Sequence, residues 1–297
     1  MFNIYHYEKK KEEFVVISNK SNSTKAEISL HKGGSLSNLI VNHKKIITDL
    51  KPLAYEKTFA SSILFPFANR VNYGKYSFLG KNYQLDCNEN ENENALHGLI
   101  YDKEFKIVNE IINKNCAEIK LLYEITNAHR GFPHSFKIEL SYELYESSLK
   151  INVSISNLGN EIFPFTVGWH PYFHIDDFNK SELIFDSKKR LDSDKRNITT
   201  KISNFKIPKP WQLNNSNFDD AFVISNNKIS LKTNYYTMNL TSTEKNNFLQ
   251  IYTPKKTNAI AIEPMTGVSD SFNNEIGLKE LKPNNEYRIG WLLEVVS

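Results

Sequence analysis

The sequence predicts an all-β protein, a large antiparallel β-sandwich with little helix. Apolar side chains alternate with polar ones along residues 136–144 and again along 149–155, and a short polar link at 146–148 joins the two runs. Alternation of period two is typical of strands with one buried and one solvated face, and the short link predicts a hairpin. No stretch of more than about eight residues shows helical periodicity, so helix is expected to be a minor component.

Shorter segments of the same kind predict further strands along the chain. Gly33 and Gly34 mark a turn between two of them, because glycine favours tight turns. The predicted strands are, in order, 14–17, 26–30, 36–41, 117–125, 222–224, 236–240, 249–252, 259–262 and 287–296. Polar runs at 88–94 and 188–209 are predicted as long surface loops. No change in composition resembles a linker, so we expect a single domain spanning residues 1–297.

Bulk composition excludes several classes of protein. The net charge of +3 is small and the lysines are scattered, which argues against a nucleic-acid partner. No window approaches 18 apolar residues, and residues 1–14 lack the apolar core of a signal peptide, so no membrane partner is expected. Cys87 and Cys116 form neither a disulfide framework nor a zinc pattern. These features favour a cytoplasmic protein with free thiols.

Two segments each offer one group suited to proton transfer. Glu263 stands before Pro264, and His170 stands before Pro171. Proline pushes the preceding residue into extended geometry, so a carboxylate and an imidazole are expected on stiff, extended backbone. Burial would raise the pKa of the glutamate, and a histidine with an ordinary pKa of about 6.5 can hold a proton. The pair suits a reaction made only of proton transfers.

Five polar clusters stand out from the alternating pattern, and two of them contain the proton-transfer groups. Each cluster alone has an ordinary structural explanation, such as a surface ion pair, a turn or a core histidine. The clusters occupy residues 68–70, 96–98, 170–173, 218–222 and 262–264.

Taken together and in this order, the clusters resemble the aldose 1-epimerase (mutarotase) family. The matching segments are FPFANRV at 65–71, LHG at 96–98, GFP at 131–133, HPYF at 170–173, FDDAF at 218–222 and IEP at 262–264. His134 stands where the family usually has a glycine after the GFP turn. The spacing to Phe222 favours Asp219 as the family's aspartate and leaves Asp220 as the alternative.

The resemblance implies a galactose mutarotase-like supersandwich that interconverts the α and β anomers of an aldose. It implies Glu263 as the base on the C1 hydroxyl and His170 as the acid on the ring oxygen. Arg70, His97 and Asp219 are the implied ligands of the sugar. No cofactor and no metal are expected, because proton transfer and an oriented sugar suffice for this reaction.

Aromatic side chains are expected to cover the apolar face of the sugar ring. Trp169, Phe173 and Phe222 are the candidates, because each lies in or beside one of the clusters. Oligomeric state is not predicted, and a monomer and a homodimer are equally open.

Two alternative functions remain open. A hexose-6-phosphate mutarotase would need a basic pocket at the C6 end of the sugar, for which Lys75, Lys103 and Arg130 are candidates. A non-catalytic carbohydrate-binding module would use the same fold, and fold alone does not separate binding from catalysis. The pair of Glu263 and His170 favours catalysis, since binding alone does not need it.

A metal enzyme is a weaker alternative. His170 and His174 are four residues apart, but Pro171 lies between them and the segment is predicted to be strand or loop. The helical face that makes such spacing a zinc site is therefore absent, and no third ligand is evident.

Overall fold

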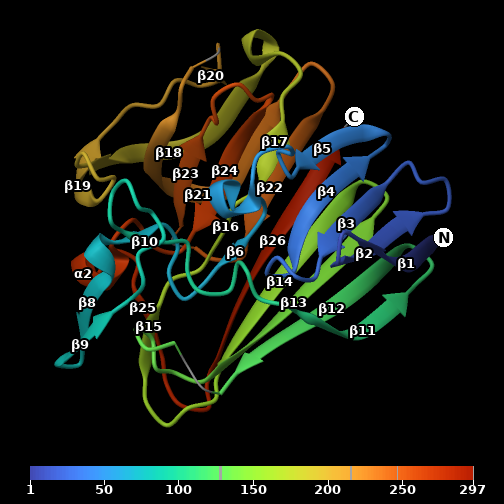
Figure 1. Cartoon of the computed structure of the whole chain (residues 1–297). Coiled ribbons are helices and arrows are strands. Elements are labelled where there is room, and N and C mark those ends of the chain that lie inside the picture. Colours follow the sequence, from blue (N-terminus) through green and yellow to red (C-terminus); the bar gives the residue numbers. More distant parts are fainter. Residues whose placement is uncertain (127–128, 215, 246, 297) are drawn as a thin grey trace.

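The structure, a computed structural model, describes residues 1–126, 129–214, 216–245 and 247–296 (Figure 1). Antiparallel strands make up most of it, which confirms the all-β prediction. The α-helices of the described chain, α1 (Tyr55–Thr58) and α2 (Ser271–Asn274), are one turn each. No helix in these ranges has the length and apolar character needed to cross a membrane.

The strands fall into three groups along the chain. The first group is β1 (Phe2–Lys9), β2 (Glu12–Asn19), β3 (Lys25–Ser29), β4 (Ser35–Val41), β5 (Lys44–Thr48), β6 (Ile63–Leu64), β7 (Arg70–Val71), β8 (Lys75–Phe78), β9 (Lys81–Gln84) and β10 (Ala95–Leu96). The second is β11 (Lys106–Ile112), β12 (Cys116–Ile125), β13 (Phe136–Tyr145), β14 (Ser148–Asn157), β15 (Phe163–Phe165), β16 (Gly168–Trp169) and β17 (Tyr172–His174). The third is β18 (Glu182–Ser193), β19 (Thr199–Asn204), β20 (Trp211–Gln212), β21 (Asp219–Lys232), β22 (Thr237–Ser242), β23 (Phe248–Tyr252), β24 (Ala259–Met265), β25 (Lys279–Leu281) and β26 (Glu286–Val296).

The predicted hairpin is present as β13 and β14, whose register pairs Phe136 with Asn157 and Leu144 with Leu149. Every second side chain of β13 is buried, as the alternation predicted. The buried row faces the core because burial of apolar surface is the main favourable term in folding.

The strands form one long antiparallel ladder that bends back on itself. From β11 it runs through β12, β13, β14, β26, β22, β21, β23, β24, β17, β5, β4, β3 and β2 to β1. Its first and last strands come together, since β1 packs near β11 and β12. Figure 1 shows the blue strands β2–β5 lying across the green strands β12–β14, so the two ends of the ladder form the layers of a sandwich.

The main apolar core lies between these layers and takes side chains from Phe2 to Val295. Trp169 and Trp291 pack there with ring centroids 5.9 Å apart, and both are fully buried. The single domain over residues 1–297 stays a prediction.

One loop prediction was wrong. Residues 188–209 were expected to be a surface loop, but β18 and β19 form a hairpin there, with Leu191 opposite Ile202. The exposed face of this hairpin carries mostly lysine and polar side chains, so few apolar positions reveal the period of the strands. The polar run 88–94 does lie in turns and loop, as expected.

Candidate active site

A cavity of about 570 Å³ brings together all five predicted site residues. Arg70, His97, His170, Asp219 and Glu263 line it, although they come from segments almost 200 residues apart. The volume suits a small-molecule ligand. Another groove, of about 630 Å³, lies on the polar face of β12, β13, β14 and β26 and contains none of the five.

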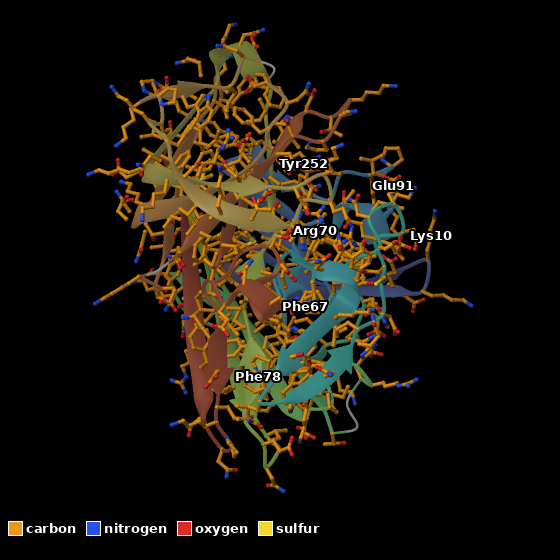
Figure 2. All side chains as sticks on the ribbon, turned by 90° about the vertical axis from the view of Figure 1, so that its left-hand side faces the viewer. Lys10, Phe67, Arg70, Phe78, Glu91 and Tyr252 are labelled. Carbon is orange, nitrogen blue, oxygen red and sulfur yellow. The ribbon has the colours of Figure 1, made fainter. Side chains whose placement is uncertain are left out.

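Three of the residues that line the cavity are labelled in Figure 2. Arg70, Tyr252 and Glu91 are labelled there and lie near one another, and all three line the cavity. The wall that carries Glu91 is the polar loop 88–94, while Tyr252 ends β23 on the other side.

Glu263 lies in a central strand. All seven residues of β24 are buried, and β23 and β17 flank the strand on either side. The extended geometry predicted from Pro264 is confirmed. The carboxyl group is 2% exposed. Burial raises its pKa well above 4.5, the negative charge of Asp219 adds to this shift, and Arg70 opposes it.

His170 lies between β16 and β17 and faces Glu263. The backbone N–H of His170 donates to the backbone carbonyl of Ser62 at 3.0 Å, and the backbone carbonyl of His170 accepts from the backbone N–H of Ser61 at 2.8 Å. The His170 Nε2 atom is 3.4 Å from Glu263 Oε1. Burial lowers the pKa of His170 to about 4, so the expected value near 6.5 was wrong. A fully desolvated imidazole disfavours its charged form.

His97 packs against His170. Their ring centroids are 5.0 Å apart at an interplanar angle of 89°, so an edge of one ring meets the face of the other. Burial lowers the pKa of His97 well below 6.5, and the nearby His170 and Arg70 lower it further. His97 is therefore a neutral imidazole that offers one donor and one acceptor to a ligand.

Several polar atoms at this cavity have no partner within the described residues. They are His97 Nδ1, His170 Nδ1 and Glu263 Oε2, all of them buried. Buried polar groups are almost always hydrogen-bonded, so three together at one cavity indicate groups that a polar ligand would satisfy.

The backbone of the cavity wall is held in an uncommon conformation. Phe59, Asn69 and His97 have φ of +48°, +63° and +62°, in the left-handed region. Such residues cluster at functional sites, where the surrounding structure holds them in place. Here the backbone N–H of His97 donates to the backbone carbonyl of Asn69 at 2.9 Å, which connects two of these residues.

Gly98 is required beside His97. Its φ is +83°, and a Cβ there would lie 2.2 Å from the carbonyl oxygen of Phe65. We expect Gly98→Ala to lower the free energy of unfolding by about 2–4 kcal/mol, because the left-handed backbone and the clash add. Gly80 is the matched control, since its φ is +76° but nothing lies within 4 Å of a Cβ. In chemical denaturation, equal losses for Gly98→Ala and Gly80→Ala would contradict the role of the clash.

Arg70 does not stand free in the cavity, which the sequence did not predict. The Arg70 Nη2 atom donates to Glu89 Oε1 at 2.7 Å, and Nε donates to both carboxylate oxygens at 3.0 Å. The Arg70 Nη1 atom donates to Asn69 Oδ1 at 2.9 Å. The expected cation is therefore present, but it is already paired with a carboxylate of the polar loop.

Asp219 and Asp220 lie on opposite faces of β21. Asp219 lines the cavity and accepts a hydrogen bond from Gln250 Nε2 at 2.9 Å. Asp220 is 3.6 Å from Arg190 and does not line the cavity. Asp219 retains solvent contact at the rim, yet desolvation raises its pKa, with Arg70 opposing and Asp220 adding to the shift.

The prediction of the aromatic cover was wrong. Trp169, Phe173 and Phe222 are fully buried in the core and do not line the cavity. Trp169 precedes His170, and neighbours in extended chain point to opposite sides, so a histidine in the cavity places the tryptophan in the core. Tyr172 and Tyr252 line the cavity instead.

Sequence reasoning also missed Gln250 and Glu89. Gln250 stands directly opposite Glu263 in the pairing of β23 with β24, a relation that no local pattern reveals. Glu89 lies in the polar run, where its own neighbourhood of asparagines and glutamates resembles ordinary surface. Lys75, Lys103 and Arg130, the candidates for a phosphate pocket, are not among the residues that line the cavity.

The geometry does not favour a metal centre at this cavity. His174, the second histidine of the HPYFH segment, does not line it. Within the described ranges, Glu13, His31 and Glu104 have potential ligand atoms within 4.8 Å of one another, but they lie outside the cavity lining. Exposed acidic groups of this kind are common without an ion.

The similarity to known proteins extends across most of the chain. The profile of the family described as Aldose 1-epimerase matches residues 13–293. The uncharacterised Escherichia coli K12 protein YihR is 24% identical over 273 residues, 86% of each chain. The uncharacterised YphB of the same organism is 34% identical over 110 residues, which is 37% of this chain and 35% of that protein.

Solved structures show the same fold. A galactose mutarotase-like protein from Clostridium acetobutylicum has a TM-score of 0.89 at 20% identity and covers 100% of this chain and 99% of its own. A galactose 1-epimerase from Lactobacillus acidophilus has a TM-score of 0.82 at 16% identity, covering 100% of this chain and 98% of its own. At these identities the likeness establishes the fold alone, and it confirms the expected mutarotase-like sandwich.

Proposed function

The chain belongs to the aldose 1-epimerase family, and on that premise we propose that it interconverts the α and β anomers of an aldose by acid–base catalysis. One observation carries the proposal: Glu263 and His170 are both buried, and their side chains meet at 3.4 Å in a cavity with unsatisfied polar atoms. Two titrating groups whose environments shift their pKa values in opposite directions are typical of acid–base sites.

The proposed reaction moves two protons and no other group. Glu263 takes the proton of the C1 hydroxyl while His170 gives one to the ring oxygen. The bond from C1 to the ring oxygen breaks, and C1 becomes an aldehyde. Rotation about C1–C2 presents its other face, and closure returns both protons to their donors. Each positioned group contributes typically about 10²–10⁴ in rate.

The two groups need one proton between them. Ring opening starts with the proton on His170 and ends with it on Glu263, and ring closure runs in the opposite direction. The raised pKa of Glu263 and the lowered pKa of His170 both favour the proton on Glu263. Burial of the two groups therefore favours the protonation state that follows ring opening. The apparent pKa values seen in a rate profile belong to the pair, not to either residue.

The lining charges favour an uncharged sugar over the hexose-6-phosphate alternative. Acidic side chains outnumber basic ones, and Arg70, the less exposed of the two basic residues, is paired with Glu89. The acidic lining residues are Glu56, Glu89, Glu91, Asp219 and Glu263, and the basic ones are Lys57 and Arg70. Like charges disfavour a phosphate dianion at this cavity.

Polarimetry on freshly dissolved α-glucose and α-galactose tests the proposal. We expect both or one of them to reach anomeric equilibrium faster than in buffer, with glucose 6-phosphate accelerated less. No acceleration with any aldose or hexose phosphate would favour the non-catalytic binding module, and a preference for the phosphorylated sugar would favour the alternative enzyme.

Asp219→Asn is expected to raise KM and lower kcat/KM together, by about tenfold, because Asp219 is proposed to anchor a sugar hydroxyl. Asp220→Asn is the matched control, since Asp220 lies on the other face of the same strand. Initial rates from polarimetry compare the two. An effect of Asp220→Asn as large as that of Asp219→Asn would contradict the assignment.

A further inference from the structure

Arg70 and Glu89 form a hydrogen-bonded ion pair in the cavity wall. The side chains are 16% and 15% exposed, so both are largely removed from water. Glu89 Oε2 also accepts a hydrogen bond from Asn94 Nδ2 at 2.9 Å. Burial raises the pKa of Glu89, but the hydrogen bonds and charge of Arg70 and the bond from Asn94 outweigh it, and the net pKa is lowered. The carboxylate is therefore ionised at neutral pH.

The pair leaves Arg70, which lines the cavity, with N–H donors that Glu89 and Asn69 do not use. A guanidinium has five N–H groups. One on Nε and one on Nη2 go to Glu89, and one on Nη1 goes to Asn69. Among the described residues, one N–H on each terminal nitrogen therefore has no acceptor and is available to a ligand.

Glu89 itself is held in place by a clamp from another part of the chain. Arg196, in the turn between β18 and β19, donates to the carbonyl of Asn92 at 3.0 Å and to Asn94 Oδ1 at 2.9 Å. Its guanidinium carbon lies 3.5 Å from the ring centroid of Tyr73. The loop that carries Glu89 is thus fixed at its far end, which keeps the carboxylate aligned with Arg70.

We infer that Glu89 is a positioning residue of this site. It holds the guanidinium of Arg70 in one orientation and offsets its charge, so that Arg70 meets the sugar as a pair of directed donors and not as a free cation. The inference rests on the proposed function for its meaning in catalysis. It adds a residue to the site and gives a physical reason for the proposed preference for an uncharged sugar.

The charge of Arg70 also acts on Glu263. The charged and titratable groups that face Glu263 are Asp219 from β21, Arg70 from β7, His170 from the segment before β17 and His97 from the segment after β10, with Tyr172 and Tyr252 beside them. Arg70 alone among them carries a fixed positive charge, and it lowers the pKa of Glu263. Removing its partner carboxylate strengthens that effect.

Glu89→Gln tests the inference against Glu91→Gln. Glu91 lines the same wall and is exposed, and the hydrogen bonds of Arg70 described above do not reach it. Both variants remove one negative charge, and the Arg70→Gln background separates an effect through Arg70 from a direct effect of the lost charge. The readout is a ¹³C NMR titration of the Glu263 carboxyl, assigned by its loss in Glu263→Gln. It needs no turnover.

We expect Glu89→Gln to lower the pKa of Glu263 by about one unit and Glu91→Gln to lower it by a few tenths at most. When Arg70 is already replaced by glutamine, Glu89→Gln should change the pKa of Glu263 only slightly, because the effect of Glu89 acts through Arg70. Glu89→Asp keeps the charge but shortens the reach, so it should preserve the pKa while raising KM. This second variant keeps the test decisive where Glu89→Gln folds poorly.

Turnover then supplies the second readout. With Glu89→Gln we expect KM for an uncharged aldose to rise about tenfold and the preference over glucose 6-phosphate to shrink by a similar factor. Equal pKa shifts in Glu89→Gln and Glu91→Gln, or an undiminished shift without Arg70, would overturn the inference even for an active enzyme. If the pKa of Glu263 shifts as expected but the protein accelerates no sugar, the proposed function would be contradicted, while the positioning role of Glu89 would still hold.

Discussion

Replacing Glu263 with glutamine is expected to lower kcat by about two orders of magnitude or more while sugar binding survives. Glutamine keeps the shape and polarity of the side chain but cannot take the C1 proton. The substitution should also fold well, because the buried carboxyl is already disposed to be neutral. Polarimetry gives kcat, and isothermal titration calorimetry with the sugar gives binding.

Glu263→Gln is also expected to change the thermal stability of the protein in a pH-dependent way. The folded-state pKa of Glu263 is raised above its ordinary 4.5, so the unfolded chain ionises first as pH increases. Below about pH 4.5 the carboxyl is protonated in both states, so its titration does not change the free energy of unfolding. Above that pH it lowers the free energy of unfolding progressively, until the pH passes the raised pKa of the folded state. Glu263→Gln removes this penalty and should raise Tm at pH 7 but not at pH 4. Near-normal turnover in the variant would show that the carboxylate is structural.

Most of the fold was predictable because it rests on local alternation. The hairpin of β13 and β14 follows from side chains that face the core at every second position, and a reader of the sequence sees that period directly. The hairpin of β18 and β19 was missed because, within the predicted loop, Leu191 is the only buried apolar side chain that the two strands contribute. Alternation of apolar and polar residues arises because one face of a strand is buried, so a strand that buries few apolar side chains shows little alternation in the sequence.

The candidate site was predictable in its members but not in its electrostatics. The order of the five clusters, read as a family resemblance, selected residues that all line one cavity. The lowered pKa of His170 arises from burial by distant segments, and the pairing of Arg70 with Glu89 arises from a loop that folds back on a strand 19 residues earlier. Register is set by turn geometry and by which face of a strand is buried, and all seven residues of β24 are buried, so alternation does not give the pairing of Gln250 with Glu263.

Replacing His170 with glutamine is expected to lower kcat by about 10²–10⁴, because the ring oxygen then loses its proton donor. His174→Gln is the matched control, since His174 follows four residues later in β17 and does not line the cavity, and it should leave kcat unchanged. Polarimetry at several pH values provides the measurement.

The double variant Glu263→Gln/His170→Gln separates a shared-proton pair from two independent groups. If the groups act as a unit, either substitution alone removes most of the catalysis, and the second should add less than about tenfold. The wild-type rate should fall at low pH, where both groups are protonated, and at high pH, where neither is. In Glu263→Gln only the titration of His170 remains, and its pKa is lowered to about 4, so the residual rate should depend little on pH between 6 and 8. Multiplicative losses in the double variant, or a residual rate that still follows a bell, would show that the proton is not shared between these two residues.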